Sequence, residues 1–165
     1  MNRLNKLPAR IFQAVLLIIL ALFLFSYFEG GSIHSNASFE NVQQALAGAV
    51  DPGLYPLMDS QKLKRTMNID PSSAVNVAFY RLDDAMSANE LLLIEYDPAQ
   101  KEELEAAART RQASQEHIYE GYAPQQAALM KDALIDFEEN YGLYYVGSDP
   151  QRVEDVFRAA LRGNS

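Results

Sequence analysis

The sequence contains no cysteine and no tryptophan, and it contains only two histidines. Without cysteine the chain can form no disulfide and offers no thiolate as a nucleophile or as a ligand for zinc or iron. The two histidines, His34 and His117, lie far apart in the sequence and lack the partners that a catalytic triad or a zinc site requires. We therefore expect neither to be catalytic, and we expect His117 to be a solvent-exposed helix residue.

Motifs for nucleotide binding and nucleophilic catalysis are also absent. No predicted strand is followed by a Gly-x-Gly-x-x-Gly or P-loop pattern, so nucleotide binding has no support. No serine lies in a nucleophile elbow, and the Ser-x-x-Lys arrangement of penicillin-binding chemistry does not occur. The sequence accordingly predicts no cofactor, no metal site and no enzymatic activity.

Acidic residues outnumber basic ones, and the formal net charge is −8. Residues 1–28 contain three cations (Arg3, Lys6 and Arg10) and no acid, so the rest of the chain carries −11. A field of this sign repels phosphate backbones and anionic lipid headgroups, which argues against nucleic-acid binding. Cationic partners or metal ions fit the charge better, although an acidic surface is also an ordinary aid to solubility.

Residues 11–28 (IFQAVLLIILALFLFSYF) form an apolar run of eighteen residues without a charged side chain. This is close to the length that a helix needs to cross the hydrocarbon of a bilayer. A helix also satisfies its own backbone hydrogen bonds inside lipid, which a loop cannot do. The run therefore predicts one transmembrane helix.

The charges on either side of the run predict its orientation. Three cations precede it and Glu29 follows it, so the positive-inside rule places the N-terminus in the cytoplasm. We expect a cytoplasmic N-terminus (1–10), a single transmembrane span (11–28), a flexible linker (29–37) and an extracytoplasmic domain (38–165). A cleaved signal peptide is the alternative, because Ser35-Asn36-Ala37 loosely resembles a cleavage site, but it lies well downstream of the long run.

Capping residues and helical spacing predict helices at both ends of the outer domain. Ser38 can cap a helix that ends before Asp51, and Asp59 can cap a shorter helix that ends near Asn68. The last helix has the clearest amphipathic pattern, with apolar residues at i, i+3, i+4, i+7 and i+8: Val153, Val156, Phe157, Ala160 and Leu161.

Two hairpins are predicted between these helices. The first pairs residues 75–79 with 90–96, and the second of these strands (ELLLIEY) is apolar enough to be central in a sheet. The second hairpin pairs residues 134–138 with 143–146, and Gly142 in its turn can supply a positive φ. A long helix from Pro98 and a shorter one from Pro124 separate the hairpins.

Each hairpin is followed by Asp-Pro and a helix, at an offset of 52 residues: Asp97-Pro98 and Asp149-Pro150. Aspartate is a good N-cap and proline a good first helical residue, so the repetition has a local cause, and duplication of a ββα unit is the alternative. A ββα unit used twice predicts an α+β fold, in which a mainly antiparallel four-stranded sheet has its helices packed on one face.

Several short motifs in the outer domain resemble a bacterial family. They are Pro56-Leu57-Met58-Asp59 with Leu63, Asn68-Ile69-Asp70, and residues 120–129 (EGYAPQQAAL). On these motifs, over about residues 38–162, the chain resembles the family called domain of unknown function 4358. The resemblance implies a small extracytoplasmic protein and carries over no activity. Many members are lipid-anchored through a cysteine, whereas this chain has none and a predicted spanning helix in its place.

Paired carboxylates can perform acid–base catalysis or bind calcium, but both uses require that the side chains converge in a cleft. Glu102 and Glu103 lie near the start of a predicted helix, where the macrodipole favours them. Asp136 alternates with Glu138 on a predicted strand. We therefore expect these carboxylates to lie on solvated faces.

Tyrosines are concentrated in the second half of the domain, and two of them flank the predicted turn between the long helix and the next. Tyrosine combines apolar area with a hydroxyl group and is enriched at protein interfaces. Tyr122, with Tyr119 and Gln125, is therefore the candidate binding segment. The alternative is an ordinary helix–helix turn whose tyrosine packs into the core.

The leading hypothesis from the sequence is a membrane-anchored extracytoplasmic binding or accessory module that contacts a protein partner in the bacterial cell envelope. A domain that binds a cell-wall glycan or a metal ion is the second reading, and an unrecognised hydrolase is the third. The absence of tryptophan weakens the glycan reading.

The predicted topology can be tested with protease. We expect external protease to remove the domain from intact wall-stripped cells, because the charge asymmetry around residues 11–28 places it outside. If the domain were protected from protease until the membrane was opened, the predicted orientation would be wrong. A soluble form that begins after Ala37 and accumulates outside the cell would show that the apolar run is a signal peptide.

Overall fold

A computed structural model describes residues 16–20 and 33–163 of the chain. The chain divides into two units, Met1–Ser32 and Ile33–Ser165. In the first unit residues 16–20 are helical, and their five aliphatic side chains are 48–63% exposed. Within the described residues no helix has both the length and the apolar character needed to cross a membrane. The rest of the predicted span, 11–15 and 21–28, lies outside the described residues.

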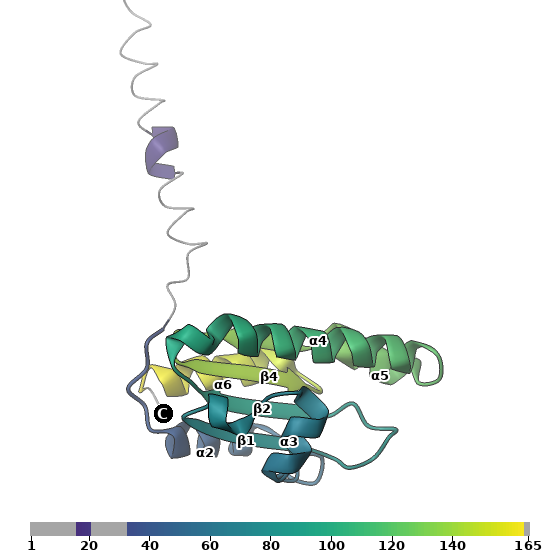
Figure 1. The fold of residues 1–165 in the computed structure, drawn as a ribbon. Helices are drawn as coiled ribbons and strands as arrows, with labels where there is room; N and C mark the ends of the chain where they lie inside the picture. The colour runs from purple at the N-terminus through teal and green to yellow at the C-terminus, as the bar shows by residue number, and fades with distance from the viewer. Residues whose placement is uncertain (1–15, 21–32, 164–165) are drawn as a thin grey trace, which may run out of the picture. The chain divides into compact units, whose positions relative to one another are not determined.

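The second unit is built on an antiparallel sheet of four strands in the order β1-β2-β4-β3 (Figure 1). Each neighbouring pair of strands is antiparallel: β1–β2 and β3–β4 are the two predicted hairpins, and the β2–β4 pair joins them. The strands are β1 (Asn76–Arg81), β2 (Glu90–Glu95), β3 (Leu134–Phe137) and β4 (Tyr141–Val146). The helices are α2 (Phe39–Ala49), α3 (Ser60–Met67), α4 (Lys101–Glu120), α5 (Pro124–Lys131) and α6 (Pro150–Leu161), with short 3-10 turns at Pro71–Ser73 and Pro98–Gln100.

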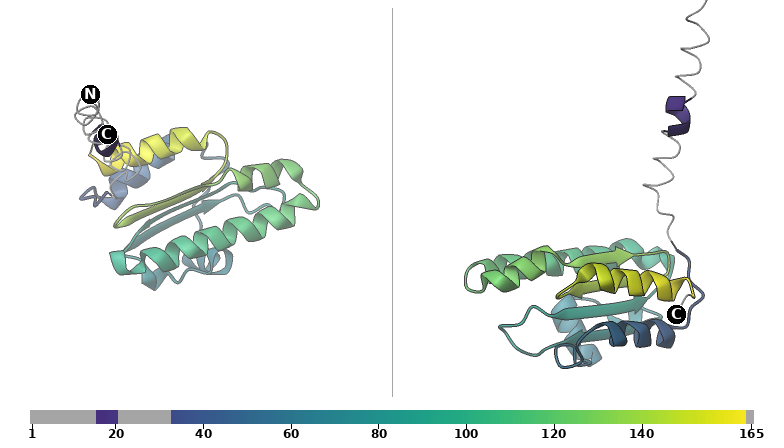
Figure 2. Two further views of the ribbon diagram at one scale, coloured as in Figure 1. Left: turned by 90° about the horizontal axis from the view of Figure 1, so that it is seen from above. Right: turned by 180° about the vertical axis from the view of Figure 1, so that it is seen from behind.

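Helices cover both faces of the sheet, so the expectation that they pack on one face is wrong. The view from above shows α2 and α6 on one side of the strands and α4 on the other (Figure 2). The side chains of β2 alternate accordingly: Leu91 and Leu93 pack with α2 and α6, whereas Leu92 and Ile94 pack with α3, α4 and α5. Because β2 is apolar on both faces, the sheet needs a helical layer on each side to exclude water.

The two predicted ββα units are alike in their strands and caps but not in the placement of their helices. Leu92 pairs with Tyr144, which lies 52 residues further along, and both belong to the core on the α4 side. Asp97 and Asp149 both accept a hydrogen bond from a backbone N–H of the turn that follows. Asp97 has an extended backbone with φ −68°, whereas Asp149 is left-handed with φ 55°. The chain therefore leaves β4 in a different direction, and α6 packs on the opposite face from α4.

The helix caps are those that the sequence predicts, but the turn of the second hairpin differs from the prediction. Ser38 and Asp59 cap α2 and α3 through their side-chain oxygens, as predicted. Gly142, by contrast, is a residue of β4 opposite Phe137 and has no positive φ. A Cβ at this position would come within 2.5 Å of the Phe137 ring, so glycine is needed here for close packing.

The predicted flexible linker 29–37 is also corrected where the structure describes it, at 33–37. Ser35 is only 5% exposed, and its hydroxyl donates to the carbonyl oxygen of Leu161 at 2.7 Å. The Asn140 side chain makes two hydrogen bonds with the Ser35 backbone, each 2.9 Å long. The segment therefore belongs to the folded unit, because its polar groups find partners in the β3–β4 turn and at the end of α6.

Replacement of a single core residue tests the packing of α6. Phe157 is fully buried, and Phe157→Ala should lower the free energy of unfolding by about 3–5 kcal/mol, through lost burial and the cavity left behind. Val75→Ala is the control, since Val75 is 64% exposed and its truncation should change stability by less than about 0.5 kcal/mol. Chemical denaturation of both variants measures the difference. If both variants lost equally little unfolding free energy, α6 would not be part of the core.

Candidate functional site

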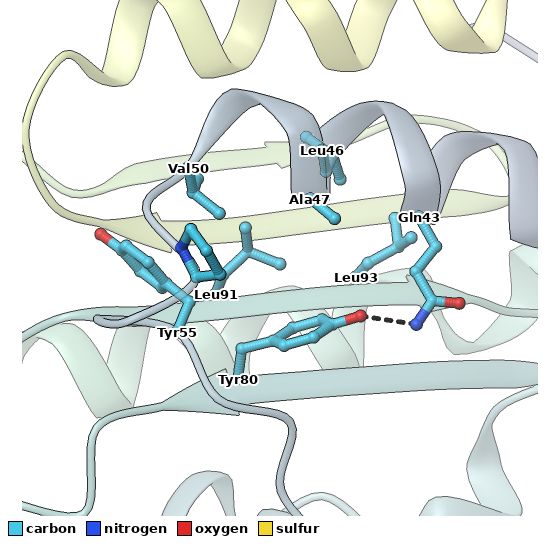
Figure 3. Close-up of a pocket in the computed structure, with 9 residues that line it drawn as sticks. Gln43, Leu46, Ala47, Val50, Tyr55, Tyr80, Leu91 and Leu93 are labelled. Atoms are coloured by element: carbon cyan, nitrogen blue, oxygen red, sulfur yellow. Dashed lines mark hydrogen bonds between the residues drawn. The ribbon is translucent and has the colours of Figure 1, made fainter.

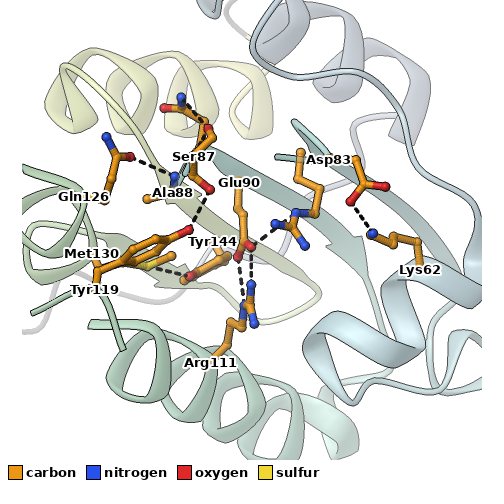
Figure 4. A network of polar contacts seen from close by, with 12 residues as sticks. Lys62, Asp83, Ser87, Ala88, Glu90, Arg111, Tyr119, Gln126, Met130 and Tyr144 are labelled. Carbon is orange, nitrogen blue, oxygen red and sulfur yellow. Dashed lines mark hydrogen bonds and ion pairs between the residues drawn. The ribbon is translucent and has the colours of Figure 1, made fainter. Parts of the chain in front are cut away.

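The predicted binding segment lies at the end of α4, against the loop that connects β1 and β2 (Figure 4). Tyr119 is only 2% exposed, and its hydroxyl donates to the Ser87 carbonyl at 2.8 Å. Tyr122 is 52% exposed, and its hydroxyl lies 3.4 Å from the Ala85 carbonyl. The two rings are tilted and their centroids are 5.6 Å apart. Tyr119 thus positions the loop, while Tyr122 keeps half of its surface available to a partner.

The two glutamines that follow have different places. The Gln125 side chain is exposed and makes no hydrogen bond within the described part of the chain. Gln126, which the sequence did not single out, accepts a hydrogen bond from the backbone N–H of Ala88 at 2.9 Å. This bond links α5 to the β1–β2 loop, in addition to the link that Tyr119 makes from α4. Gln125 therefore stays a candidate contact residue, and Gln126 is a positioning residue.

Three large apolar side chains are exposed in these two segments: Met86 in the loop (55%), Ile118 in α4 (47%) and Tyr122 (52%). We call them the Tyr122 surface. The Met86 backbone is held in place by a hydrogen bond from its N–H to the Asp84 carboxylate at 2.8 Å. Asp84 and Glu120 are exposed in the same segments, so the surface combines apolar area with negative charge.

A buried charge cluster lies at the base of the same loop, and sequence reasoning missed it. Glu90, the first residue of β2, is 1% exposed and accepts two hydrogen bonds from Arg111 of α4, at 2.5 and 3.1 Å (Figure 4). Arg81 of β1 lies opposite Glu90 in the sheet, with its Nε 3.6 Å from the carboxylate. Glu90 is the first residue of the ELLLIEY run, and nothing in the surrounding sequence indicates that its side chain is buried.

Electrostatics in this cluster keep the Arg111 guanidinium charged and paired with Glu90. Burial lowers the pKa of Arg111, but the hydrogen bonds and the charge of Glu90 outweigh burial and the pKa is raised overall. Burial, followed by the charge of Glu90, raises the pKa of Tyr144 well above its usual value. Removing one member of a buried ion pair leaves the other uncompensated, which is costly. The cluster therefore fastens α4 to the sheet beneath the loop.

A second charge cluster overturns the expectation that Asp136 and Glu138 lie on an exposed strand face. They are 8% and 4% exposed, and both face Arg158 of α6. Arg158 donates to Asp136 Oδ1 at 3.1 Å, and its Nη1 lies 2.9 Å from Glu138 Oε1. Alternation along the strand was correctly recognised, but the covering helix comes from a distant part of the sequence.

Asp136 holds its proton unusually well for an aspartate. Burial raises its pKa to about 6, the charge of Arg158 opposes that shift, and the charge of Glu138 adds to it. A carboxyl group that titrates near neutral pH can serve as a general acid. Here, however, Arg158 bridges both carboxylates, and Glu138 also accepts a hydrogen bond from the Ile33 backbone at 2.6 Å. The arrangement is that of an internal ion-pair network.

The remaining titratable groups do not gather into a metal site. Over residues 16–20 and 33–163, no group of three or more histidines and carboxylates is arranged to hold a metal ion. His117 is exposed on α4, as expected, and its Nδ1 lies 3.5 Å from Glu120. His34 lies 3.3 Å from Glu139. The metal-ion reading thus gains no support from this part of the chain.

The fold and these clusters define a small α+β domain whose sheet is covered by helices on both faces. The carboxylates of its two charge clusters are buried, and the Tyr122 surface is exposed. The chain belongs to the family described as domain of unknown function (DUF4358), whose family model matches residues 53–147. The matched range contains the sheet, α3, α4, α5 and the Tyr122 surface. No curated protein and no solved structure matches the chain.

The raised pKa of Asp136 predicts a specific pH dependence of stability. Because the folded state binds this proton more tightly than the unfolded state, the contribution of Asp136 is greatest at low pH and is lost as pH rises through about 6. Relative to Asp136→Asn, the wild-type chain should therefore gain about 1 kcal/mol of unfolding free energy between pH 7.5 and pH 5.

Denaturant titrations at several pH values measure this difference. Glu103→Gln is the control, because Glu103 is exposed on α4 and its removal should leave the pH dependence unchanged. Parallel curves for the wild-type chain and Asp136→Asn would contradict the assignment.

Proposed function

We propose that the chain is a membrane-anchored extracytoplasmic binding or accessory module of the bacterial cell envelope, and that it binds a protein partner through the Tyr122 surface. The observation that carries the proposal is the exposure of Met86, Ile118 and Tyr122 on segments that are otherwise firmly held. Tyrosine is among the residues that most often dominate binding energy at protein interfaces. The expected partner presents an apolar side chain with basic residues around it, because Asp84 and Glu120 accompany the surface.

The surface is organised before a partner arrives. Tyr119 bonds to Ser87, Gln126 bonds to Ala88, and Asp84 bonds to the Met86 backbone, so consecutive parts of the β1–β2 loop are each held. Loops that are already ordered lose less conformational entropy when they bind. A rigid tip with one half-exposed tyrosine is suited to specific recognition.

The proposed anchor is the apolar run 11–28, with three cations before it. Residues 16–20 are helical and expose only aliphatic side chains, which suits contact with lipid. A tether of this kind would hold the acidic domain outside the membrane, near other envelope proteins. Cleavage as a signal peptide stays the alternative, and the protease experiment distinguishes the two.

The hydrolase reading is less well supported than the binding reading. Its best candidates are the carboxylates of Asp136 and Glu138, and both are engaged by Arg158. A glycan could stack on the exposed ring of Tyr122, so cell-wall fragments belong in the binding test as competitors.

Site-specific crosslinking in cells tests the proposed surface. A photo-crosslinking amino acid at position 86 of the full chain should capture a defined partner, whereas the same group at position 57 should not. Leu57 is the matched control, because it is 60% exposed and lies outside the Tyr122 surface. Capture of the same set of proteins from both positions would contradict a specific surface.

Affinity for the purified partner then tests the role of Tyr122. Tyr122→Ala should weaken binding by more than about five-fold while the melting temperature stays nearly unchanged. Leu57→Ala should leave affinity unchanged, and Glu120→Lys should weaken binding to a basic partner. If Tyr122→Ala lowered the melting temperature as well as the affinity, Tyr122 would have a structural role instead. Competition by soluble cell-wall fragments would favour the glycan alternative.

A further inference from the structure

An apolar cavity of about 140 Å³ lies between α2 and the sheet (Figure 3). It is on the face that carries Leu91 and Leu93, opposite the face against which Tyr119 packs. The cavity is therefore separate from the Tyr122 surface. Its apolar walls come from α2, the loop that follows α2, and β2: Leu46, Ala47, Val50, Pro52, Leu91 and Leu93.

The walls are unfavourable for water and for charge. Among the described residues no charged side chain lines the cavity, and a water molecule would need two to four polar partners to be held there. An ionic group would lose its hydration without finding a counter-charge. An apolar cavity of about this volume is large enough for a single six-membered ring. The walls thus select a small, neutral, apolar guest.

The rim adds a polar pair that the described residues do not fully satisfy. The Gln43 amide donates to the Tyr80 hydroxyl at 2.5 Å (Figure 3). This bond leaves the hydroxyl proton of Tyr80 and the amide oxygen of Gln43 without a partner among residues 16–20 and 33–163. Tyr55, on another wall, already donates to the Val146 carbonyl at 2.9 Å. One donor and one acceptor are therefore adjacent at Tyr80 and Gln43.

We propose that this cavity is a binding site for a small neutral molecule that has one apolar ring and one hydroxyl group, as in a phenol. The ring would occupy the space between Leu46 and Leu93, which both line the cavity. The hydroxyl of the guest would accept from Tyr80 and donate to Gln43, which satisfies both groups at once. The ring supplies affinity by burying apolar area, and the polar pair fixes its orientation.

Titration of the full chain with phenol tests the proposal directly. With the chain in lipid nanodiscs and its leucine methyl groups labelled for NMR, phenol should shift the signals of Leu91 and Leu93 in a saturable manner. Fluorobenzene has a ring of the same size without the hydroxyl. It should bind about three- to ten-fold more weakly, as expected for the loss of one or two net hydrogen bonds. Absence of saturable shifts with phenol at millimolar concentrations overturns the proposal.

Variants separate the ring site from the polar rim. Ala47→Phe should fill the cavity and abolish the phenol shifts, whereas Gln44→Phe, an equally bulky change at a residue of α2 that does not line the cavity, should not. Tyr80→Phe should retain ring binding but reduce the preference for phenol over fluorobenzene to less than about two-fold. Unchanged binding in Ala47→Phe, or an unchanged preference in Tyr80→Phe, would show that phenol does not bind as proposed.

Binding of this guest does not depend on a protein partner at the Tyr122 surface. A chain that binds phenol in the cavity but shows no specific crosslinking at position 86 would support the cavity and contradict the proposed function. The reverse result would contradict the cavity alone. If the cavity accepted only an aromatic side chain from a larger partner, phenol would give no saturable shifts and the small-molecule proposal would be wrong.

Discussion

Burial of β2 on both faces is the constraint on which the rest of the domain depends. Its leucines and isoleucine alternate between two cores, one beneath α2 and α6 and the other beneath α3, α4 and α5. Strand β4 beside it has the same property, with Tyr144 in one core and Tyr145 in the other. Two central strands that are apolar on both sides cannot be covered by one layer of helices. The helices after the two hairpins therefore belong to opposite layers.

Each helical layer is also joined to the sheet by a buried carboxylate. Glu90 receives Arg111 from α4 on one face, and Asp136 receives Arg158 from α6 on the other. Such pairs contribute little net stability, because the charges lose hydration when they are buried. A helix that slid or rotated would separate the pair and leave a buried charge uncompensated. The clusters are therefore better understood as devices that specify helix position than as catalytic groups.

Two features of the described domain could receive another molecule. The Tyr122 surface exposes apolar side chains on a loop end that is already ordered. The cavity beneath α2 encloses apolar space and presents a donor and an acceptor at its rim. One feature suits a protein surface and the other suits a small guest, and they lie on opposite sides of the sheet. We propose both features as sites for binding rather than for catalysis.

The sequence by itself determined the elements, because their causes are local. Side-chain caps at Ser38 and Asp59, Asp-Pro starts and hairpin loops depend on residues close together in the chain, and the two antiparallel hairpins follow from them. The exposure of Tyr122 was anticipated as one of two alternatives. Only the tertiary structure decided which face each helix covers. It also decided that Gly142 lies under a phenyl ring, and that Asp136 is buried against an arginine. These features depend on contacts between residues distant in sequence, and periodicity along one segment does not encode what another segment will place on top of it.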